Sequence, residues 1–469
     1  MGVAVSSWRL AGAVSSCGQL GVVSGTGLDA VFSRRLQLGD PDGHMRLALD
    51  NFPISEMAER VWQRYFVDGG KSENKPYKSR PVAVQKSPTP LLELTVIANF
   101  AEVFLAKRGH AGLVGINLME KIQLPTLPSL FGAMLANVDF VLMGAGIPRS
   151  IPGILDRLAG LQHTTQKLDV HGALPGEGFE VEFDPAPFTP TCITELNRPK
   201  FLAIISSSTL AMSLAKKSTG HVDGFIVEGP TAGGHNAPPR GPLQLSESGE
   251  PVYGPRDVPD LEDIRGLGLP FWLAGSYSEP ERLQEALDAG ASGIQVGTPF
   301  AFCEESGIDP DIKRRVVEQC LDGRGFVFTD PNASPTGFPF KVFGLGGSLS
   351  DTEVYERRVR TCDLGYLRQT YRKEDGTVGY RCPAEPEEDY LRKGGKPEDM
   401  AHRKCVCNGL LATVGLGQIR KDGSHEPPIV TTGDDVVNLA RFIPVGQTTY
   451  RAADVIEYLL TLRLARACV

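Results

Sequence analysis

The residues best suited to chemistry lie in the segment 223–236, which reads Asp-Gly-Phe-Ile-Val-Glu-Gly-Pro-Thr-Ala-Gly-Gly-His-Asn. Its apolar run, residues 225–227, predicts a buried strand of a parallel sheet. Gly233 and Gly234 follow and would let the backbone approach a flat or anionic ligand closely. His235, whose side chain ordinarily titrates near neutral pH, would stand beside that ligand and exchange a proton with it. The pattern therefore predicts a catalytic loop.

Two more strand-and-glycine units follow about sixty residues later. Residues 271–276 read as a buried strand and a glycine turn, 279–289 as an amphipathic helix, and 293–298 as a further strand that ends in Gly-Thr. Barrels of the (β/α)8 type hold a phosphate through backbone N–H groups after their seventh and eighth strands. The predicted phosphate donors are Gly275, Ser276, Gly297 and Thr298.

These motifs together resemble the flavin-dependent nitronate monooxygenases, formerly called 2-nitropropane dioxygenases. The similar stretches are 232–235, 273–276 and 295–298, with 115–118 and 144–148 matching earlier strands, and the resemblance covers residues 1 to about 345. Within it, residues 228–240 are most similar to a branch that contains the trans-acting enoyl reductases of polyunsaturated fatty acid and polyketide synthases.

The resemblance implies a TIM (β/α)8 barrel that binds FMN non-covalently, with a helical insertion at about 44–90 and a smaller C-terminal region. It implies an oxidoreductase that oxidises nitronates or nitroalkanes with oxygen, with His235 as the catalytic acid or base. Glu228 would either orient His235 or be a carboxylate at the rim. The residues implied to bind the cofactor are Gly2, Val3, Asn117, Gly233, Gly234, Ala274, Gly275, Ser276, Gly297 and Thr298.

Two other functions remain open at this stage. One keeps the FMN, takes electrons from NADPH and reduces an enoyl thioester on an acyl carrier protein. The other is a non-catalytic barrel that serves as a binding subunit of a synthase. A small-molecule substrate, a tethered acyl chain and a homodimer are therefore all compatible with the sequence.

The elements between these motifs favour a parallel α/β fold, because predicted strands alternate with helices. The expected strands are 2–6, 18–27, 114–117, 140–143, 168–170 and 201–205, and the expected helices are 55–65, 91–107, 129–136 and 151–159, with one more that follows the serines 206–208 and ends at Lys217. Family barrels usually begin several residues earlier, so the first strand is expected to lack its leading residues. Ser6 or Ser7 would cap the helix after it.

Residues 346–469 differ in composition from the predicted barrel, which spans 1–345. The segment from about Gly347 to Met400 carries dense charge and has poor apolar periodicity. A final helix at 452–465 is expected to pack against the barrel wall or a partner subunit. Four of the nine cysteines, Cys362, Cys382, Cys405 and Cys407, fall in this region. Their spacing matches no standard zinc or iron–sulfur pattern, and we predict reduced thiols rather than a metal site.

Length and charge narrow the class of protein. The chain has 469 residues, 41% of them hydrophobic, enough for a barrel core and an additional region. A formal net charge of -8 disfavours nucleic acid as the main partner. No stretch approaches the roughly 20 apolar residues of a membrane span. Together with irregularly spaced cysteines, these features predict a cytoplasmic protein with no membrane partner.

Overall fold

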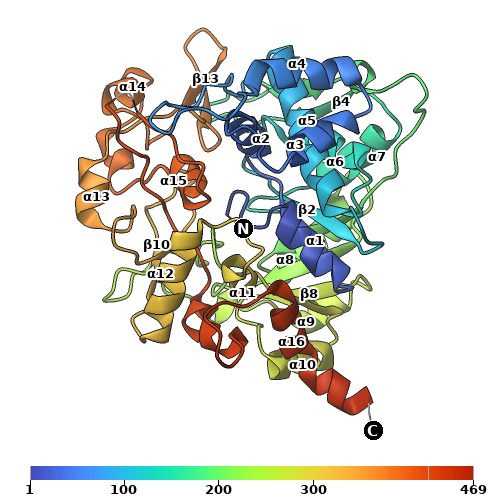
Figure 1. Ribbon diagram of the computed structural model, residues 1–469, viewed down its shortest axis with the longest axis vertical. Helices are drawn as coiled ribbons and strands as arrows, with labels where there is room; N and C mark the ends of the chain where they lie inside the picture. The colour runs from blue at the N-terminus through green and yellow to red at the C-terminus, as the bar shows by residue number, and fades with distance from the viewer. Residues whose placement is uncertain (1, 421, 468–469) are drawn as a thin grey trace.

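A seven-stranded, wholly parallel sheet forms the centre of the computed structural model, which describes residues 2–420 and 422–467. The strand order is β1-β2-β3-β6-β7-β8-β9, and the sheet curls like part of a TIM barrel with helices outside it (Figure 1). Its strands are β1 (Gly21–Ser24), β2 (Val114–Met119), β3 (Phe140–Gly144), β6 (Lys200–Ile205), β7 (Gly224–Glu228), β8 (Phe271–Ala274) and β9 (Gly293–Gln295). The helices up to β9 are α1 (Trp8–Ser16), α2 (Leu28–Gln37), α3 (His44–Asp50), α4 (Ser55–Tyr65), α5 (Thr89–Ala106), α6 (Thr126–Leu135), α7 (Ile151–Ala159), α8 (Ser208–Lys217), α9 (Leu261–Arg265) and α10 (Pro280–Asp288).

Side chains alternate across this sheet, as the pleat of a strand requires. On β7, Phe225 and Val227 join the large core between the sheet and its helices, whereas Ile226 faces the inner, concave side. The same alternation sends Phe271 and Leu273 of β8 outward. Residues that end on the inner side are therefore placed to meet a ligand inside the curl.

The expected strand at residues 2–6 is wrong. This segment is a turn, in which Val5 N donates to Gly2 O at 3.3 Å and Ala4 has a φ of +52°. It still lies beside β1, since Ser24 N donates to Ser6 O at 2.8 Å. Within the described residues the sheet has seven strands, so an extended backbone completing an eighth is not found there. Ser7 precedes α1 but makes no side-chain cap.

The expected strand at 168–170 is also misplaced. The observed strand is β4 (Thr164–Lys167), and it pairs antiparallel with β5 (Glu180–Phe183) in a separate two-stranded ribbon. The central sheet passes directly from β3 to β6 instead. Local apolar content identified a strand here but could not identify its partner, which lies across a long connection.

Helix α5 is long and apolar enough to cross a membrane by length and composition, but 78% of its apolar window is buried inside the protein. It packs against α1, α2, α3, α4 and α6. This is the environment of a core helix, in agreement with its low amphipathicity. The insertion at 44–90 supplies α3 and α4 to this packing and continues as irregular chain.

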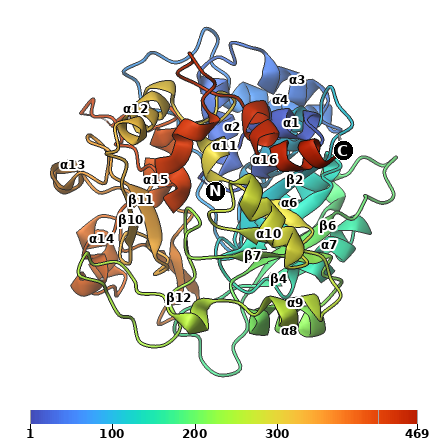
Figure 2. The same cartoon turned by 90° about the horizontal axis from the view of Figure 1, so that it is seen from below.

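Most of the remaining elements lie to one side of the sheet in both views, whereas the last helix of the chain lies beside α10 (Figures 1 and 2). They comprise α11 (Thr298–Phe302), α12 (Pro310–Leu321), β10 (Val327–Asp330), β11 (Phe340–Phe343), α13 (Thr352–Arg357), β12 (Gln369–Arg372), β13 (Val378–Arg381), α14 (Glu387–Arg392), α15 (Val406–Thr413), the 3-10 helix η4 (Asp434–Phe442) and α16 (Ala452–Ala467). Helix α16 returns to the barrel and packs on α1 and α10, as expected for the wall-packing alternative. Two buried clusters cross the predicted boundary near residue 345. One contains Val3 and Leu410, and the other contains Val5 and Val455.

Candidate functional site

One large cavity, of about 490 Å³, opens on the inner face of the sheet at its carboxyl edge. This is the edge where parallel α/β barrels carry their chemistry, and the volume falls in the range of small-molecule sites. Every residue predicted to bind the cofactor or to act in catalysis lines it. These residues are Gly2, Val3, Asn117, Gly233, Gly234, His235, Ala274, Gly275, Ser276, Gly297 and Thr298. The structure thus brings together positions that are nearly 300 residues apart in the chain.

The turns after β8 and β9 present unpaired backbone donors to this cavity. Gly275 has a φ of +97° and Ser276 a φ of +54°, so the chain reverses sharply just after the strand. Within the described residues, the N–H groups of Gly275, Ser276 and Gly297 donate no hydrogen bond. Grouped free N–H donors at strand ends are suited to an anion such as a phosphate.

Gly233 is required for a different reason from the one expected. A Cβ at Gly233 would lie 2.6 Å from Gly433 N and 2.7 Å from Thr432 C. The missing side chain therefore admits the chain's own segment 431–434, which crosses the loop at this point. Thr431 Oγ1 accepts a hydrogen bond from Gly234 N at 3.1 Å. The glycine pair is thus a packing site between two segments as well as part of the cavity wall.

Thr298, one of the predicted phosphate donors, already contacts the segment 431–434. The Thr298 hydroxyl accepts a hydrogen bond from Gly433 N at 3.0 Å. Its proton remains available to a ligand, because a hydroxyl can donate and accept at once. Asp435 also lines the cavity, but Arg441 neutralises it through contacts of 2.6 and 2.7 Å.

His235 is held firmly in the cavity wall. Its Nε2 lies 2.6 Å from Ser334 Oγ, and its ring packs against Phe340 at 4.7 Å between centroids. The backbone at His235 forms a bridge to the same residue on β11. Burial lowers the pKa of the imidazole to about 3, so the ring is neutral at physiological pH. The neutral ring can accept a proton or relay one, but it does not carry a positive charge at rest.

Glu228 ends β7 on the cavity side. Burial raises the pKa of its carboxyl to about 7, because the walls keep water from solvating the charge. Its carboxylate has no hydrogen-bond or ion-pair partner among the described residues. A carboxyl that changes charge near neutral pH inside a cavity is a candidate acid or base. The structure does not pair it with His235, so the orienting role is not seen.

Asn117 lies on the inner face of β2, between Ser24 of β1 and Leu142 of β3 in register. Its carboxamide lines the cavity and makes no hydrogen bond within the described part of the chain. An amide has two donors and an acceptor, so this side chain could bind a polar ring edge. The sequence predicted that the strand ends at Asn117, but β2 continues to Met119, so Asn117 lies two residues before its end.

Several lining residues were not predicted from the sequence. They come from the C-terminal region and include Tyr366, Cys407, Thr431, Thr432, Gly433 and Asp435, while Ser334 contacts His235 from just before β11. These residues follow no strand-and-glycine pattern. Only the Thr-Thr-Gly-Asp-Asp run at 431–435, a helix-start pattern, was a usable local signal.

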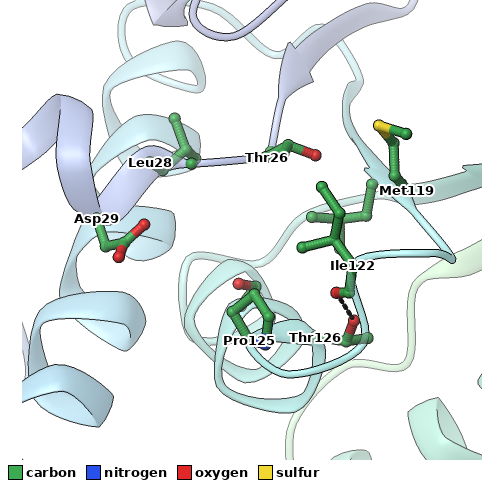
Figure 3. A pocket seen from close by; sticks show the side chains of 11 residues that line it. Thr26, Leu28, Asp29, Met119, Ile122, Pro125 and Thr126 are labelled. Carbon is green, nitrogen blue, oxygen red and sulfur yellow. Dashed lines mark hydrogen bonds between the residues drawn. The ribbon is translucent and has the colours of Figure 1, made fainter. Parts of the chain in front are cut away.

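A second pocket of only about 10 Å³ lies where β1 and β2 end. Figure 3 shows Asp29 at the start of α2 and Ile122 and Thr126 near the start of α6, with the Thr126 hydroxyl donating to Ile122 O at 2.9 Å. Thr26 and Ile122 border both this pocket and the large cavity. The space suffices for about one water molecule, so the large cavity remains the ligand site.

Comparison with known proteins gives a family for the middle of the chain. Residues 160–330 match the family model described as nitronate monooxygenase. A (3aS,4S,5R,7aS)-5-hydroxy-7a-methyl-1-oxo-octahydro-1H-indene-4-carboxyl-CoA dehydrogenase of Mycobacterium tuberculosis is 30% identical over 120 residues, covering 26% of this chain and 30% of the relative. A probable nitronate monooxygenase of Bacillus subtilis is 31% identical over 127 residues, covering 27% and 34%. The alignments thus span about a third of the length of these relatives.

Among solved structures, a nitroalkane oxidase from Streptomyces ansochromogenes aligns over 100% of this chain and 95% of its own, with 15% identity and a TM-score of 0.47. The curled parallel sheet, with glycine turns at its carboxyl edge, defines the class as a TIM-barrel-like α/β fold. Residues 160–330, which carry β6 to β9 and His235, are the part of the chain that matches the nitronate monooxygenase family.

Proposed function

We propose that the large cavity binds FMN and that the protein is an FMN-dependent oxidoreductase of the nitronate monooxygenase type, oxidising nitronates or nitroalkanes with oxygen. The observation that supports this most directly is the set of unpaired N–H groups at Gly275, Ser276 and Gly297. They stand at neighbouring strand ends within the segment that matches the family model.

The donor set fits a phosphate monoester. Three free N–H groups and the hydroxyls of Ser276 and Thr298 can surround its oxygens without a metal ion. A Cβ at Gly297 would meet nothing within 4 Å, so this wall leaves room for the ligand. Asn117 would hold the polar edge of the flavin ring, and Gly2 and Val3 would lie along the same wall. FMN, when bound there, supplies the electron transfer.

The chain's own residues would manage the proton. His235, neutral and fixed by Ser334, would accept a proton from the carbon of a nitroalkane at its free ring nitrogen. Glu228, at the end of the same strand β7 that leads into the His235 loop, would release or take up a proton near neutral pH. The surrounding apolar side chains, such as Ile226 and Trp272, would exclude water from this exchange.

A second candidate is an NADPH- and FMN-dependent trans-acting enoyl reductase that acts on a thioester of an acyl carrier protein. One relative is named as a dehydrogenase of a carboxyl-CoA compound, which is a thioester. Part of the cavity wall is also apolar, with Leu283, Leu287 and Leu459 facing it, as an acyl chain would require. A cytoplasmic location suits either function, because the eight described cysteines are free thiols.

The test is a set of measurements on the purified protein. We expect a flavin spectrum with about one FMN per chain by release and quantification. Anaerobic mixing with a nitronate should bleach the flavin under the first candidate, and anaerobic NADPH should bleach it under the second. A protein that neither contains FMN nor binds added FMN would overturn both and leave the non-catalytic subunit.

A further inference from the structure

Four cysteines from three separate segments surround one small pocket beside the large cavity. Cys362 lies before β12, Cys382 directly after β13, and Cys405 and Cys407 at the start of α15. The pocket measures about 10 Å³. Among the described residues, no group of three or more His, Cys, Asp or Glu side chains is arranged to hold a metal ion. The cluster needs a different explanation.

The four thiols are not equivalent. Cys362 packs against a buried cluster that contains Cys382 and Cys405. The neighbouring Cys382 thiol lowers the pKa of the Cys362 thiol against the effect of burial, and Arg368 lowers it further. Cys362 and burial raise the pKa of the Cys382 thiol, and burial raises that of Cys405 to about 11. Cys362 is also partly exposed, whereas Cys382 is buried. A partly exposed thiol whose pKa is lowered thus packs against a buried thiol whose pKa is raised.

We propose that Cys362 and Cys382 form a redox-active dithiol that a small hydroperoxide oxidises to a disulfide. The Cys362 thiolate attacks one peroxide oxygen, the O–O bond breaks, and the other oxygen leaves with a proton as water or an alcohol. Cys362 is then a sulfenic acid. The Cys382 sulfur attacks the Cys362 sulfur, the S–O bond breaks, and water departs with the Cys382 proton. Two electrons pass from the two thiols to the peroxide.

This dithiol is connected to the wall of the large cavity. Tyr366 and Leu367, four and five residues after Cys362, line that cavity, and Cys407 borders both spaces. A disulfide would tie the segment that carries Tyr366 to the end of β13. The oxidation state of the pair would therefore change the position of residues that line the ligand site, although neither sulfur lies in that site.

The test uses the chain of 469 residues in which Cys17 and Cys192, the exposed cysteines of its described part, are replaced, Cys17→Ser and Cys192→Ser. The protein is treated with hydrogen peroxide, its remaining thiols are alkylated, and it is digested with trypsin, which separates the two cysteines by cutting after Arg368 and Arg381. We expect a Cys362–Cys382 linked peptide pair about 2 Da lighter than the two free peptides, while Cys303 and Cys320 stay alkylatable.

Two variants define the order of events. Cys382→Ser should stop the reaction at a sulfenic acid on Cys362 that dimedone labels, and Cys362→Ser should leave Cys382 reduced. Cys320→Ser, at a buried cysteine of the α12 core, is the matched control and should oxidise like the parent. Zinc or iron bound in stoichiometric amount, or Cys362 and Cys382 oxidised no faster than Cys303 and Cys320, would overturn the proposal.

Discussion

His235 differs from an ordinary buried histidine because its position is fixed twice, by Ser334 at the ring and by Phe340 at the backbone. The unbonded ring nitrogen is thereby kept in one place, which is what proton transfer to a bound ligand demands. Glu228, at the end of β7, from which the loop with His235 continues, carries the group whose charge changes near neutral pH. The site thus contains a fixed neutral base and a titrating carboxyl.

Replacing His235 with alanine should separate cofactor binding from turnover. The N–H donors of Gly275, Ser276 and Gly297 do not depend on the imidazole, so the variant should keep its flavin absorbance. Turnover of neutral nitroalkanes should fall about 10²- to 10⁴-fold, because they must lose a proton, and that of pre-formed nitronates much less. Ser334→Ala, which removes only the hydroxyl partner, is the control and should have a smaller effect. Equal loss on both substrate forms would exclude His235 as the base.

Replacing Glu228 with glutamine should change how stability depends on pH. The folded protein raises the pKa of this carboxyl from 4.5 to about 7, so the stability that the protonated form contributes is complete below pH 4.5 and is lost as pH rises through 7. Glutamine does not ionise, so at pH 8 the variant should melt at a higher temperature than the parent. Its free energy of unfolding should be higher by on the order of 1–2 kcal/mol, a value reduced for water in the cavity. At pH 4 the two proteins should melt alike. A constant difference from pH 4 to 8 would contradict the assignment.

At the scale of elements, the carboxyl edge of the sheet is built by two kinds of glycine. Gly275, with its φ of +97°, is needed for the turn itself, and a Cβ there would lie 2.9 Å from Thr231 Oγ1. Gly297 has no such constraint and faces open space. Gly275 is therefore required for folding and Gly297 for ligand binding, although both follow a strand in the same sequence motif.

Gly297→Leu should give a folded, colourless protein. The side chain would enter the space proposed for the phosphate, and its Cβ would meet no protein atom within 4 Å, so FMN occupancy should drop at least about tenfold with little change in melting temperature. Gly178→Leu, at a loop glycine that also has nothing within 4 Å, is the matched control and should retain the flavin. FMN retained in full by Gly297→Leu would place the phosphate elsewhere.

The sequence predicted the strands and turns of this edge well, because buried strands followed by glycines leave a local pattern. Ser55–Tyr65 and Ile151–Ala159 were predicted with their observed ends for the same reason, an amphipathic period and adjacent breakers. The contacts of segment 431–434 were not predicted, since Gly233 and Gly433 meet across 200 residues of chain. The segment 2–6 was predicted as a strand because apolar content does not distinguish an extended chain from the turn observed.

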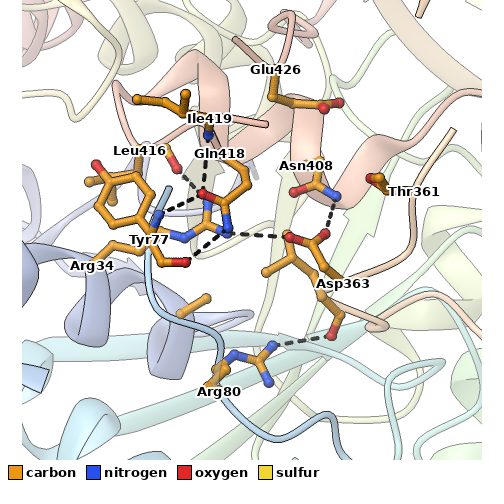
Figure 4. A network of polar contacts seen from close by, with 12 residues as sticks. Arg34, Tyr77, Arg80, Thr361, Asp363, Asn408, Leu416, Gln418, Ile419 and Glu426 are labelled. Atoms are coloured by element: carbon orange, nitrogen blue, oxygen red, sulfur yellow. Dashed lines mark hydrogen bonds and ion pairs between the residues drawn. The ribbon is translucent and has the colours of Figure 1, made fainter. Parts of the chain in front are cut away.

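At the scale of the molecule, a buried polar network joins the barrel to the C-terminal region (Figure 4). Arg34 of α2 donates to Leu416 O at 2.5 Å, and the backbone of Tyr77 exchanges two hydrogen bonds with the Gln418 amide. Arg80 reaches Leu364 O at 3.2 Å. Each bond links residues more than 280 positions apart, so the barrel and the C-terminal region should unfold together rather than as separate domains.

Within that network Arg80 pairs with Asp29 at 3.0 Å, and Tyr366 donates its hydroxyl to the same carboxylate at 2.5 Å. Both charged side chains are only 5–6% exposed, so removing one leaves the other charge buried without its partner. Asp29→Asn and Arg80→Met should each lower the free energy of unfolding by about 3–5 kcal/mol.

The double variant tests whether this loss comes from the pair itself. Because no lone charge remains, Asp29→Asn with Arg80→Met should cost clearly less than the sum of the two single changes, by about 1–3 kcal/mol in urea unfolding. The surface pair Arg314 and Glu318, both more than half exposed, is the matched control, and its cycle should give below about 1 kcal/mol. Tyr366 lines the large cavity, so the singles should also weaken FMN binding. If the losses in free energy of unfolding at Asp29 and Arg80 were additive, the pair would not couple the two regions. If FMN binding were also unchanged, the network would not support the site.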